Sequence, residues 1–450
     1  MMDGMTTSHR FSNQNLRKLI VPLFIEHLMI VLVGIADVFM VSFAGEAAVS
    51  GVTLVNMFVT FFIYVFASLA SGGAVIISQY LGRKDQDRAE LAAGQLLALS
   101  VLVSALCAFA VLAWNHSILN VLFGRVDKDV MQACATYQRI MAISFVPLGI
   151  YNSGAAICRC ISRTDITLRF SAAANVINVL GNALGIFVLK AGVAGVAWAS
   201  VAALSFSAAA VTMFCMRDEN IIRYRKKNIL RFRRESLGKI LSVALPNSLE
   251  NGLFQLVKVA LSSITAMFGT VQIAANGIAQ TIWSLSALMV VAMGPVFITV
   301  IGQCMGAGEA GEADYYFRKL MKISLAAALG WNILVFALTP MIMRFFPLSA
   351  DIRDLVIELV LIHNIFNGLA WPFGGALPNG LRAAGDVRFA MMVTIASTLL
   401  VRLFLSVAFG IWLDMGVIGI AWAMVCDWIA RAIAFAIRYR QGKWRNMRLV

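Results

Sequence analysis

Charged residues are scarce in this chain of 450 residues. They account for 13% of the sequence, whereas hydrophobic residues account for 60%. A soluble domain is usually about 25% charged and about 45–50% apolar. The shortage of charge leaves almost no sequence for a soluble domain, and it predicts a protein that is embedded in a membrane.

Motifs for catalysis, nucleotide binding and metal binding are missing as well. The seven cysteines are scattered, and the close pair Cys158 and Cys160 has no second pair to match it. This pattern excludes a disulfide framework and a zinc site. The chain has no Gly-x-x-x-x-Gly-Lys-Ser/Thr phosphate loop, which argues against ATP as the source of energy, and no His-Glu-x-x-His or Gly-x-Ser-x-Gly motif. We therefore expect neither an enzyme nor a bound cofactor.

Twelve apolar segments run along the chain, and about 20 such residues are enough to cross a bilayer. The first segment contains acids and no small-residue cleavage site follows it, so it is a retained helix and not a signal peptide. The segments are approximately 19–42, 50–81, 89–114, 128–155, 166–189, 192–216, 237–267, 273–305, 315–341, 351–380, 386–411 and 416–440.

Lys and Arg are distributed unevenly between the connecting segments. Of the 37 basic residues, 28 lie in the two terminal segments and in every second loop, 5 lie in the other loops, and 4 lie within apolar segments. By the positive-inside rule, both chain ends lie in the cytoplasm of a bacterial cell, with the helices in the inner membrane. This placement also accounts for the net charge of +14 without any nucleic-acid partner. We expect the basic residues of 217–236 to lie at the membrane surface.

The chain repeats itself at one constant offset, which relates position 22 to position 246. The recurring motifs are Pro22-x-x-x-Glu26 with Pro246-x-x-x-Glu250, Gln79-x-x-Gly82 with Gln303-x-x-Gly306, and the Gly-x-x-Gly-x-Ala-Trp runs that start at Gly192 and Gly416. Because each half has an even number of helices, the halves keep the same orientation.

The predicted fold is therefore an all-α polytopic membrane protein. Twelve transmembrane helices form two six-helix lobes that are related by a parallel pseudo-two-fold repeat. The expected boundaries are 1–216 for the N-lobe, 217–236 for a basic cytoplasmic linker and 237–450 for the C-lobe.

The segment 19–42 carries polar residues that are expensive at membrane depth and are therefore candidates for function. Glu26 and Asp37 fall on nearly one face of a helix, and His27 adjoins Glu26. Pro22 and Gly34 make the same helix able to bend.

Together these features resemble the MATE (multidrug and toxic compound extrusion) family of transporters, of the bacterial type. The resemblance covers essentially the whole chain. It is carried by Pro22 with Asp37, Gln79-Tyr-Leu-Gly82, the run from Gly192, Pro246 with Glu250, and Leu381-Arg382-Ala-Ala-Gly385-Asp386. It implies a monomer whose two lobes form a V around a central cleft, and which exports organic, often cationic, compounds in exchange for H⁺ or Na⁺.

The resemblance also implies an ion-coupling site in the N-lobe. Asp37 would be its carboxylate, and the matching polar positions are Asn178, Asn182 and Ser200. Many members have Asp where this chain has Asn182, so a two-acid proton network is absent here. One carboxylate with amide oxygens, from Asp37, Asn178 and Asn182, still suits Na⁺. The alternative for Asp37 is a structural ion pair with Arg or Lys.

Glu250 matches an acid of the NorM-like branch, whose members carry a second acid on a later helix. The segment 351–380 offers His363, Asn364 and Asn367 there instead. Lys258 follows Glu250 by about two helical turns, so it is a candidate to neutralise this acid.

Further residues are candidates for a proton path or for substrate contact, each with a purely structural alternative. They are Glu26, His27, Lys258, Asn276, Gln280, His363 and Asn367. Asp427 and Arg431 are an i, i+4 pair on one helix face, which favours structural neutralisation.

The sequence therefore predicts a secondary active antiporter that takes small organic cations or drugs as substrates and contacts membrane lipids. A second reading keeps the same fold and makes the protein an exporter or flippase of a lipid, an oligosaccharide or a metabolite. A non-transporting receptor is a third reading, and the acids at membrane depth argue against it.

Overall fold

The computed structural model describes residues 9–124, 126–230, 232–344, 349–447 and 449–450, and its regular structure in this part of the chain is helical. The first half contains α1 (Asn13–Ser42), α2 (Glu46–Gly82), α3 (Gln86–Ala113), α4 (Asn115–Phe123), α5 (Lys128–Ile143), α6 (Phe145–Cys160), α7 (Thr164–Ala183) and α8 (Gly192–Cys215). The short α9 (Lys226–Leu230) follows. The second half contains α10 (Arg234–Thr265), α11 (Thr270–Ser286), α12 (Leu288–Gly306), α13 (Ala310–Met343), α14 (Ala350–Leu369), α15 (Leu377–Ala384), α16 (Val387–Ala396), α17 (Phe404–Val407) and α18 (Gly416–Arg440). Wider π-helical turns extend several of these helices, at Leu184–Val188, Pro372–Ala376, Ser397–Leu403 and Ala408–Trp412.

Ten of the described helices are long and apolar enough to cross a membrane, and the number rises to twelve if each of two bent pairs is one span. The pairs are α5 with α6, bent by 43°, and α14 with Pro372–Ala384, bent by 59°. The predicted segment 273–305 consists of two helices, α11 and α12, that meet at Ala287. The all-helical membrane fold predicted from the sequence is confirmed.

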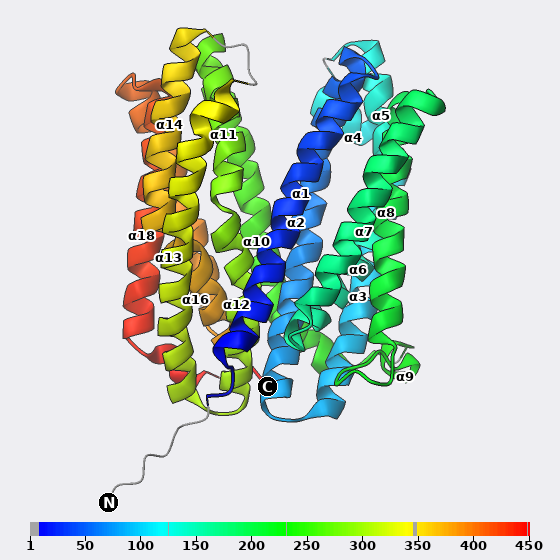
Figure 1. Ribbon diagram of the computed structural model, residues 1–450, viewed down its shortest axis with the longest axis vertical. Helices are drawn as coiled ribbons and strands as arrows, with labels where there is room; N and C mark the ends of the chain where they lie inside the picture. The colour runs from blue at the N-terminus through cyan, green and yellow to red at the C-terminus, as the bar shows by residue number, and fades with distance from the viewer. Residues whose placement is uncertain (1–8, 125, 231, 345–348, 448) are drawn as a thin grey trace, which may run out of the picture.

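The helices form two bundles, which we call the N-half (α1–α8) and the C-half (α10–α18). Figure 1 shows that the two bundles lie together at the end that carries the chain termini and are splayed apart at the other end. One apolar core is built from both halves, and two further cores lie wholly within the N-half and wholly within the C-half. The shared core therefore joins the halves, while each half also holds itself together.

A repeated hydrogen bond ties the halves to each other inside this shared region. The Gln79 side-chain amide of α2 donates to the backbone oxygen of Ala383 at 2.7 Å. The Gln303 amide of α12 donates to the backbone oxygen of Cys160 at 2.9 Å. We call these two bonds the glutamine latch. Since each bond crosses from one half to the other, the latch follows the internal repeat.

The chain ends reinforce the same region. The backbone N–H of Phe11 donates to the Tyr316 hydroxyl at 2.7 Å, and that hydroxyl donates to the Phe11 carbonyl at 2.8 Å. The backbone N–H of Arg10 donates to Glu312 at 2.6 Å. Arg10 and Phe11, which precede α1, are thus bound to α13, so the C-half holds the chain just before the N-half begins.

The basic linker also has a structural partner. Arg225 and Arg223 lie 2.5 Å and 3.6 Å from the carboxylate of Glu90, whose side chain is buried on α3. These two arginines are engaged by an acid of the N-half, while the predicted contact of the linker with the membrane surface stays a prediction.

Two glycines allow α2 and α12 to cross at the latch. A Cβ atom at Gly306 would lie 2.6 Å from the Cα of Gln79, and one at Gly82 would lie 2.9 Å from the carbonyl carbon of Gln303. Both distances are closer than real Cβ contacts. The atoms in the way belong to the backbone of a packed helix, so a side chain cannot simply turn aside. The latch therefore requires residues without side chains at this crossing.

We expect Gly306→Ala to destabilise the detergent-solubilised protein by about 1–3 kcal/mol, because overpacking a tight contact costs that much. Gly311→Ala is the matched control, since a Cβ there meets nothing within 4 Å. Thermal unfolding followed by tryptophan fluorescence measures both variants. An equal melting temperature for Gly306→Ala and Gly311→Ala would contradict the tight crossing.

Candidate functional site

The N-half holds a chain of polar side chains that ends on Asp37. The Asn182 amide of α7 donates to Asp37 Oδ1 at 2.7 Å and to Asn178 Oδ1 at 3.2 Å. Asn178 in turn donates to the Ser200 hydroxyl of α8 at 3.1 Å. The four residues predicted for the N-lobe site therefore lie together, on α1, α7 and α8. The i, i+4 spacing of Asn178 and Asn182 places both amides on one face of α7.

Asp37 has no Lys or Arg partner in the described part of the chain. Its hydrogen bond comes from a neutral amide, and Asn182 Oδ1 is buried without a partner among the described residues. A carboxylate that lacks a fixed counter-charge in a poorly polar medium stabilises a proton or a small cation. The set of carboxylate and amide oxygens suits H⁺ or a hard cation such as Na⁺. This arrangement disfavours the alternative of a structural ion pair.

Glu26 is neutralised in the structure. Its side chain is 2% exposed and accepts hydrogen bonds from Tyr151 at 2.9 Å and from Thr167 at 3.0 Å. The Arg159 guanidinium completes the cluster at 3.5 Å from Oε1. Such fixed pairing fits the structural alternative for Glu26 better than a proton path.

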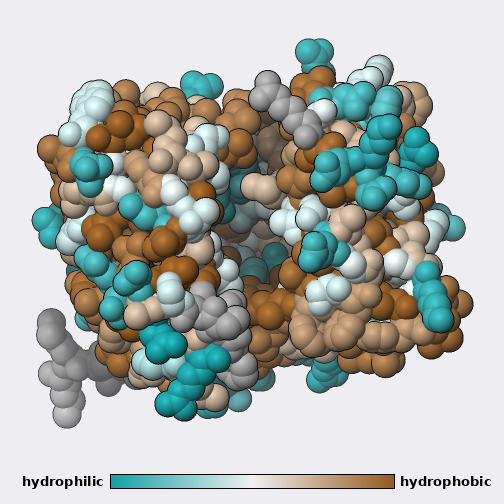
Figure 2. Space-filling model, turned by 90° about the horizontal axis from the view of Figure 1, so that it is seen from above, coloured by the Kyte–Doolittle hydropathy of each residue, from teal (hydrophilic) through white to brown (hydrophobic). Residues whose placement is uncertain are grey.

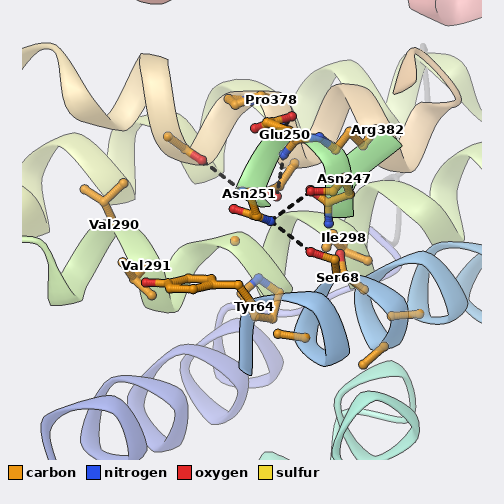
Figure 3. Close-up of a pocket in the computed structure, with 18 of the residues that line it drawn as sticks. Tyr64, Ser68, Asn247, Glu250, Asn251, Val290, Val291, Ile298, Pro378 and Arg382 are labelled. Carbon is orange, nitrogen blue, oxygen red and sulfur yellow. Dashed lines mark hydrogen bonds and ion pairs between the residues drawn. The ribbon is translucent and has the colours of Figure 1, made fainter. Parts of the chain in front are cut away.

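Glu250 has an equivalent partner in the C-half. Arg382 Nη2 lies 2.7 Å and 2.6 Å from the two carboxylate oxygens, as Figure 3 shows. Arg382 also donates to Asn379 Oδ1 at 3.1 Å. Arg382 lies in the last turn of α15. Gly385 ends this helix with a left-handed φ of 114°, a conformation that favours glycine. Lys258 does not neutralise Glu250, in contrast to the interpretation considered from the sequence.

These two ion pairs flank a central cavity between the halves. Its volume is about 400 Å³, and its wall includes His27 and Arg159 from the N-half with Glu250 and Arg382 from the C-half. Figure 2, seen from above, shows the hollow between the halves with hydrophilic residues inside it. A hydrogen bond from Asn251 of α10 to Ser68 of α2, at 2.9 Å, crosses the halves at its edge (Figure 3).

The remaining candidates lie apart from this cavity. Lys258, Asn276, Gln280 and His363 line a second pocket of about 340 Å³ within the C-half. Asn367 donates instead to Asn332 Oδ1 at 3.0 Å and is part of a buried amide cluster between α13 and α14. Asn276 and Gln280, candidates for a proton path or for substrate contact, thus line the second pocket and not the cavity between the halves.

Asp427 and Arg431 form the ion pair that their spacing predicts. Arg431 Nε donates to Asp427 Oδ1 at 2.9 Å, and both side chains are buried. Ser397 donates to the same oxygen at 2.5 Å. The prediction of structural neutralisation is confirmed.

Sequence reasoning missed the roles of Arg159 and Arg382. The separation between Arg159 and Arg382 differs by one residue from the offset of the internal repeat. Since Glu26 and Glu250 are related by the repeat itself, this nearly shared offset was the signal that could have paired each acid with its arginine. The latch glutamines were likewise visible as a repeated motif without a role.

The MatE family model matches residues 22–184 and 246–408, so each half of the chain is matched once. The chain belongs to the MATE family of transporters. It is therefore an integral membrane transporter, and this family is not an enzyme family.

Individual relatives are distant but cover nearly the whole chain. An uncharacterised transporter, YisQ of Bacillus subtilis, is 26% identical over 94% of this chain and 93% of its own length. A probable multidrug resistance protein, NorM of Thermotoga maritima, is 21% identical over 96% and 93%. A solved multidrug resistance MATE transporter in an outward-facing conformation has a TM-score of 0.89 at 20% identity, with 96% of each chain covered.

We expect Arg382→Gln to destabilise the protein by about 3–5 kcal/mol, because it leaves a buried carboxylate without its counter-charge. The double variant Glu250→Gln with Arg382→Gln removes both charges, so it loses much less stability than the sum of the single variants. Thermal unfolding of the three variants measures the coupling.

The solvent-exposed pair of Arg163 and Asp165 is the control for this cycle, since their side chains are 48% and 41% exposed. Removing that pair leaves the melting temperature nearly unchanged. Strictly additive losses at Glu250 and Arg382 would show that the two charges do not stabilise each other.

Proposed function

We propose that this MATE transporter is a secondary active antiporter that exports organic drugs or toxic compounds in exchange for H⁺ or Na⁺. The observation that carries the proposal is that Asp37 has no basic partner among the described residues. Glu26, Glu250 and Asp427 are each bound by an arginine, whereas Asp37 is bound by the neutral amide of Asn182. An acid at membrane depth with no fixed counter-charge is where a coupling ion gains most by binding.

Alternating access requires that the ion favour one arrangement of the halves over another. A ligand shifts such an equilibrium only by its differential affinity for the two states. Asp37 lies on α1, and its partners Asn182 and Ser200 lie on α7 and α8. An ion that draws these oxygens together changes how α1 packs, and Pro22 with Gly34 allows α1 to bend in response.

The splayed end of the two halves lies opposite the chain termini (Figure 1). With the termini in the cytoplasm of a bacterial cell, as the distribution of Lys and Arg favours, the central cavity opens to the outside. The latch and the shared core then close the cytoplasmic end. Relatives whose names refer to multidrug resistance or toxin extrusion support drugs as the substrate class. We take the transporting unit to be a monomer.

Efflux from proteoliposomes tests this function directly. An inward H⁺ gradient and an inward Na⁺ gradient are imposed separately, and release of a fluorescent drug is followed in each case. We expect one of the two gradients to accelerate release above the rate of liposomes without protein. Equal rates under both gradients and under none would contradict antiport.

We expect Asp37→Asn to reduce this gradient-driven release to the rate of protein-free liposomes, because the amide binds neither H⁺ nor Na⁺ as a carboxylate does. Asp414→Asn is the matched control. Asp414 is exposed with a φ of 53°, a left-handed conformation in which Asn is also well tolerated. Full gradient-driven release by Asp37→Asn would rule out Asp37 as the coupling acid.

A further inference from the structure

The second pocket occupies the place in the C-half that corresponds to the Asp37 site in the N-half. The matched ranges 22–184 and 246–408 have equal lengths, so position 22 of the first corresponds to position 246 of the second. The same offset relates Asp37 to Leu261, Asn178 to Arg402, and Ser200 to Met424. All three of these C-half residues line the second pocket.

The side-chain contacts follow the same correspondence. Asn178 donates to Ser200 Oγ at 3.1 Å in the N-half. In the C-half, Arg402 Nη2 lies 3.0 Å from the sulfur of Met424. The two contacts join repeat-related positions, so the pocket is the counterpart of the ion site. A thioether is only a weak acceptor, which leaves the guanidinium poorly satisfied.

The charge of the site is reversed between the halves. The C-half has the apolar residue Leu261 at the position related to Asp37, and it has Lys258 at the position related to Gly34. Lys258 and Arg402 both line the pocket, and its lining in the described part of the chain contains no Asp or Glu. Neither cation forms an ion pair with a described residue. The nearby acid Asp427 is itself occupied by Arg431, at 2.9 Å.

Buried polar groups in the pocket also lack partners. His363 is 1% exposed, and both of its ring nitrogens lack a hydrogen-bond partner among the described residues. Arg402 is 5% exposed, and its Nε also lacks a hydrogen-bond partner among the described residues. Unsatisfied donors and uncompensated cations are costly in a buried setting, and an anion that accepts from them removes both costs.

Aromatic rings border the two cations. The Arg402 guanidinium lies 5.1 Å and the Lys258 ammonium 6.0 Å from the centroid of the Phe254 ring. Trp283 borders both this pocket and the central cavity. Flat rings stack favourably against such side chains, and the volume of about 340 Å³ is that of a small-molecule site.

We propose that this pocket binds an aromatic organic anion, with its carboxylate or sulfonate held by Arg402 and Lys258 and its ring against Trp283. The guanidinium supplies paired donors in the geometry that a carboxylate accepts. The proposal rests on the proposed export function, since it names a substrate class for it. The transporter then accepts anionic or zwitterionic compounds, with the negative group in the C-half.

Fluorescence polarisation with the purified full-length protein in nanodiscs tests this assignment. The probes are fluorescein, which is anionic, and rhodamine 123, which is cationic and shares the same fused-ring core. We expect Arg402→Gln and Lys258→Gln each to weaken fluorescein binding by at least about ten-fold, because each removes a charged hydrogen-bond donor. Rhodamine 123 binding stays within about two-fold.

Two further variants separate charge from folding. Lys258→Arg keeps the charge and is expected to bind fluorescein as the unmodified protein does. Lys322→Gln removes an exposed lysine of α13 outside the pocket, and leaves both probes unaffected. Unchanged fluorescein affinity in both Arg402→Gln and Lys258→Gln would overturn the assignment.

Competition with the unmodified protein provides a test that needs no variant. Benzenesulfonate is expected to displace fluorescein, whereas benzylamine at the same concentration does not. Equal displacement by inorganic phosphate would overturn the organic ligand in favour of a small-anion site. The binding test and the proposed function can fail independently. Unchanged fluorescein binding in the pocket variants would not contradict Asp37-dependent efflux of cations. Full efflux by Asp37→Asn would not contradict anion binding in the pocket.

Discussion

Neutralising charge at membrane depth is the constraint on which this structure depends. Burying an isolated ion costs several kcal/mol or more, so each acid or base within the spans needs a counter-charge or a ligand. Arg159 meets this need for Glu26, Arg382 for Glu250 and Arg431 for Asp427. The charges left over are informative, since among the described residues Asp37 remains without a basic partner in the N-half, and Arg402 without an acidic one in the C-half.

The internal repeat explains why these leftovers fall at corresponding places in the two halves. The latch that joins the halves is duplicated, with one bond from Gln79 and one from Gln303. Each half also repeats one ion pair of its own, at Glu26 and at Glu250. Symmetry at the joint lets both halves contribute to one shared core. The two polar sites have diverged instead, since the positions of Asp37 and Asn178 in the N-half are taken by Leu261 and Arg402 in the C-half. One scaffold therefore carries an unpaired acid in one half and an unpaired arginine in the other, among the described residues.

The all-helical membrane fold was predictable from the sequence, because apolar segments and basic loops follow directly from the bilayer. The division into two halves was predictable from the constant offset of the repeated motifs. Asp37 was a candidate as an acid at membrane depth, and its neighbours Asn178 and Asn182 were named by the family resemblance. The arginine partners of Glu26 and Glu250 were not predicted, because these pairs join helices far apart in the chain, as with Glu250 and Arg382. Lys258 looked like the partner along the helix, but packing turns it into another pocket.

The central claim of the proposed function is that neutralising the carboxylate of Asp37 favours a different arrangement of the two halves. It is tested by the distance between spin labels at Ser42 and Thr270, which lie at the ends of α1 and α11 in the two halves. Pulsed electron spin resonance in nanodiscs compares the protein carrying Asp37 with the neutral Asp37→Asn form, in a background without other cysteines. The account predicts a shift to shorter distances when position 37 is neutral. Identical distance distributions would contradict it.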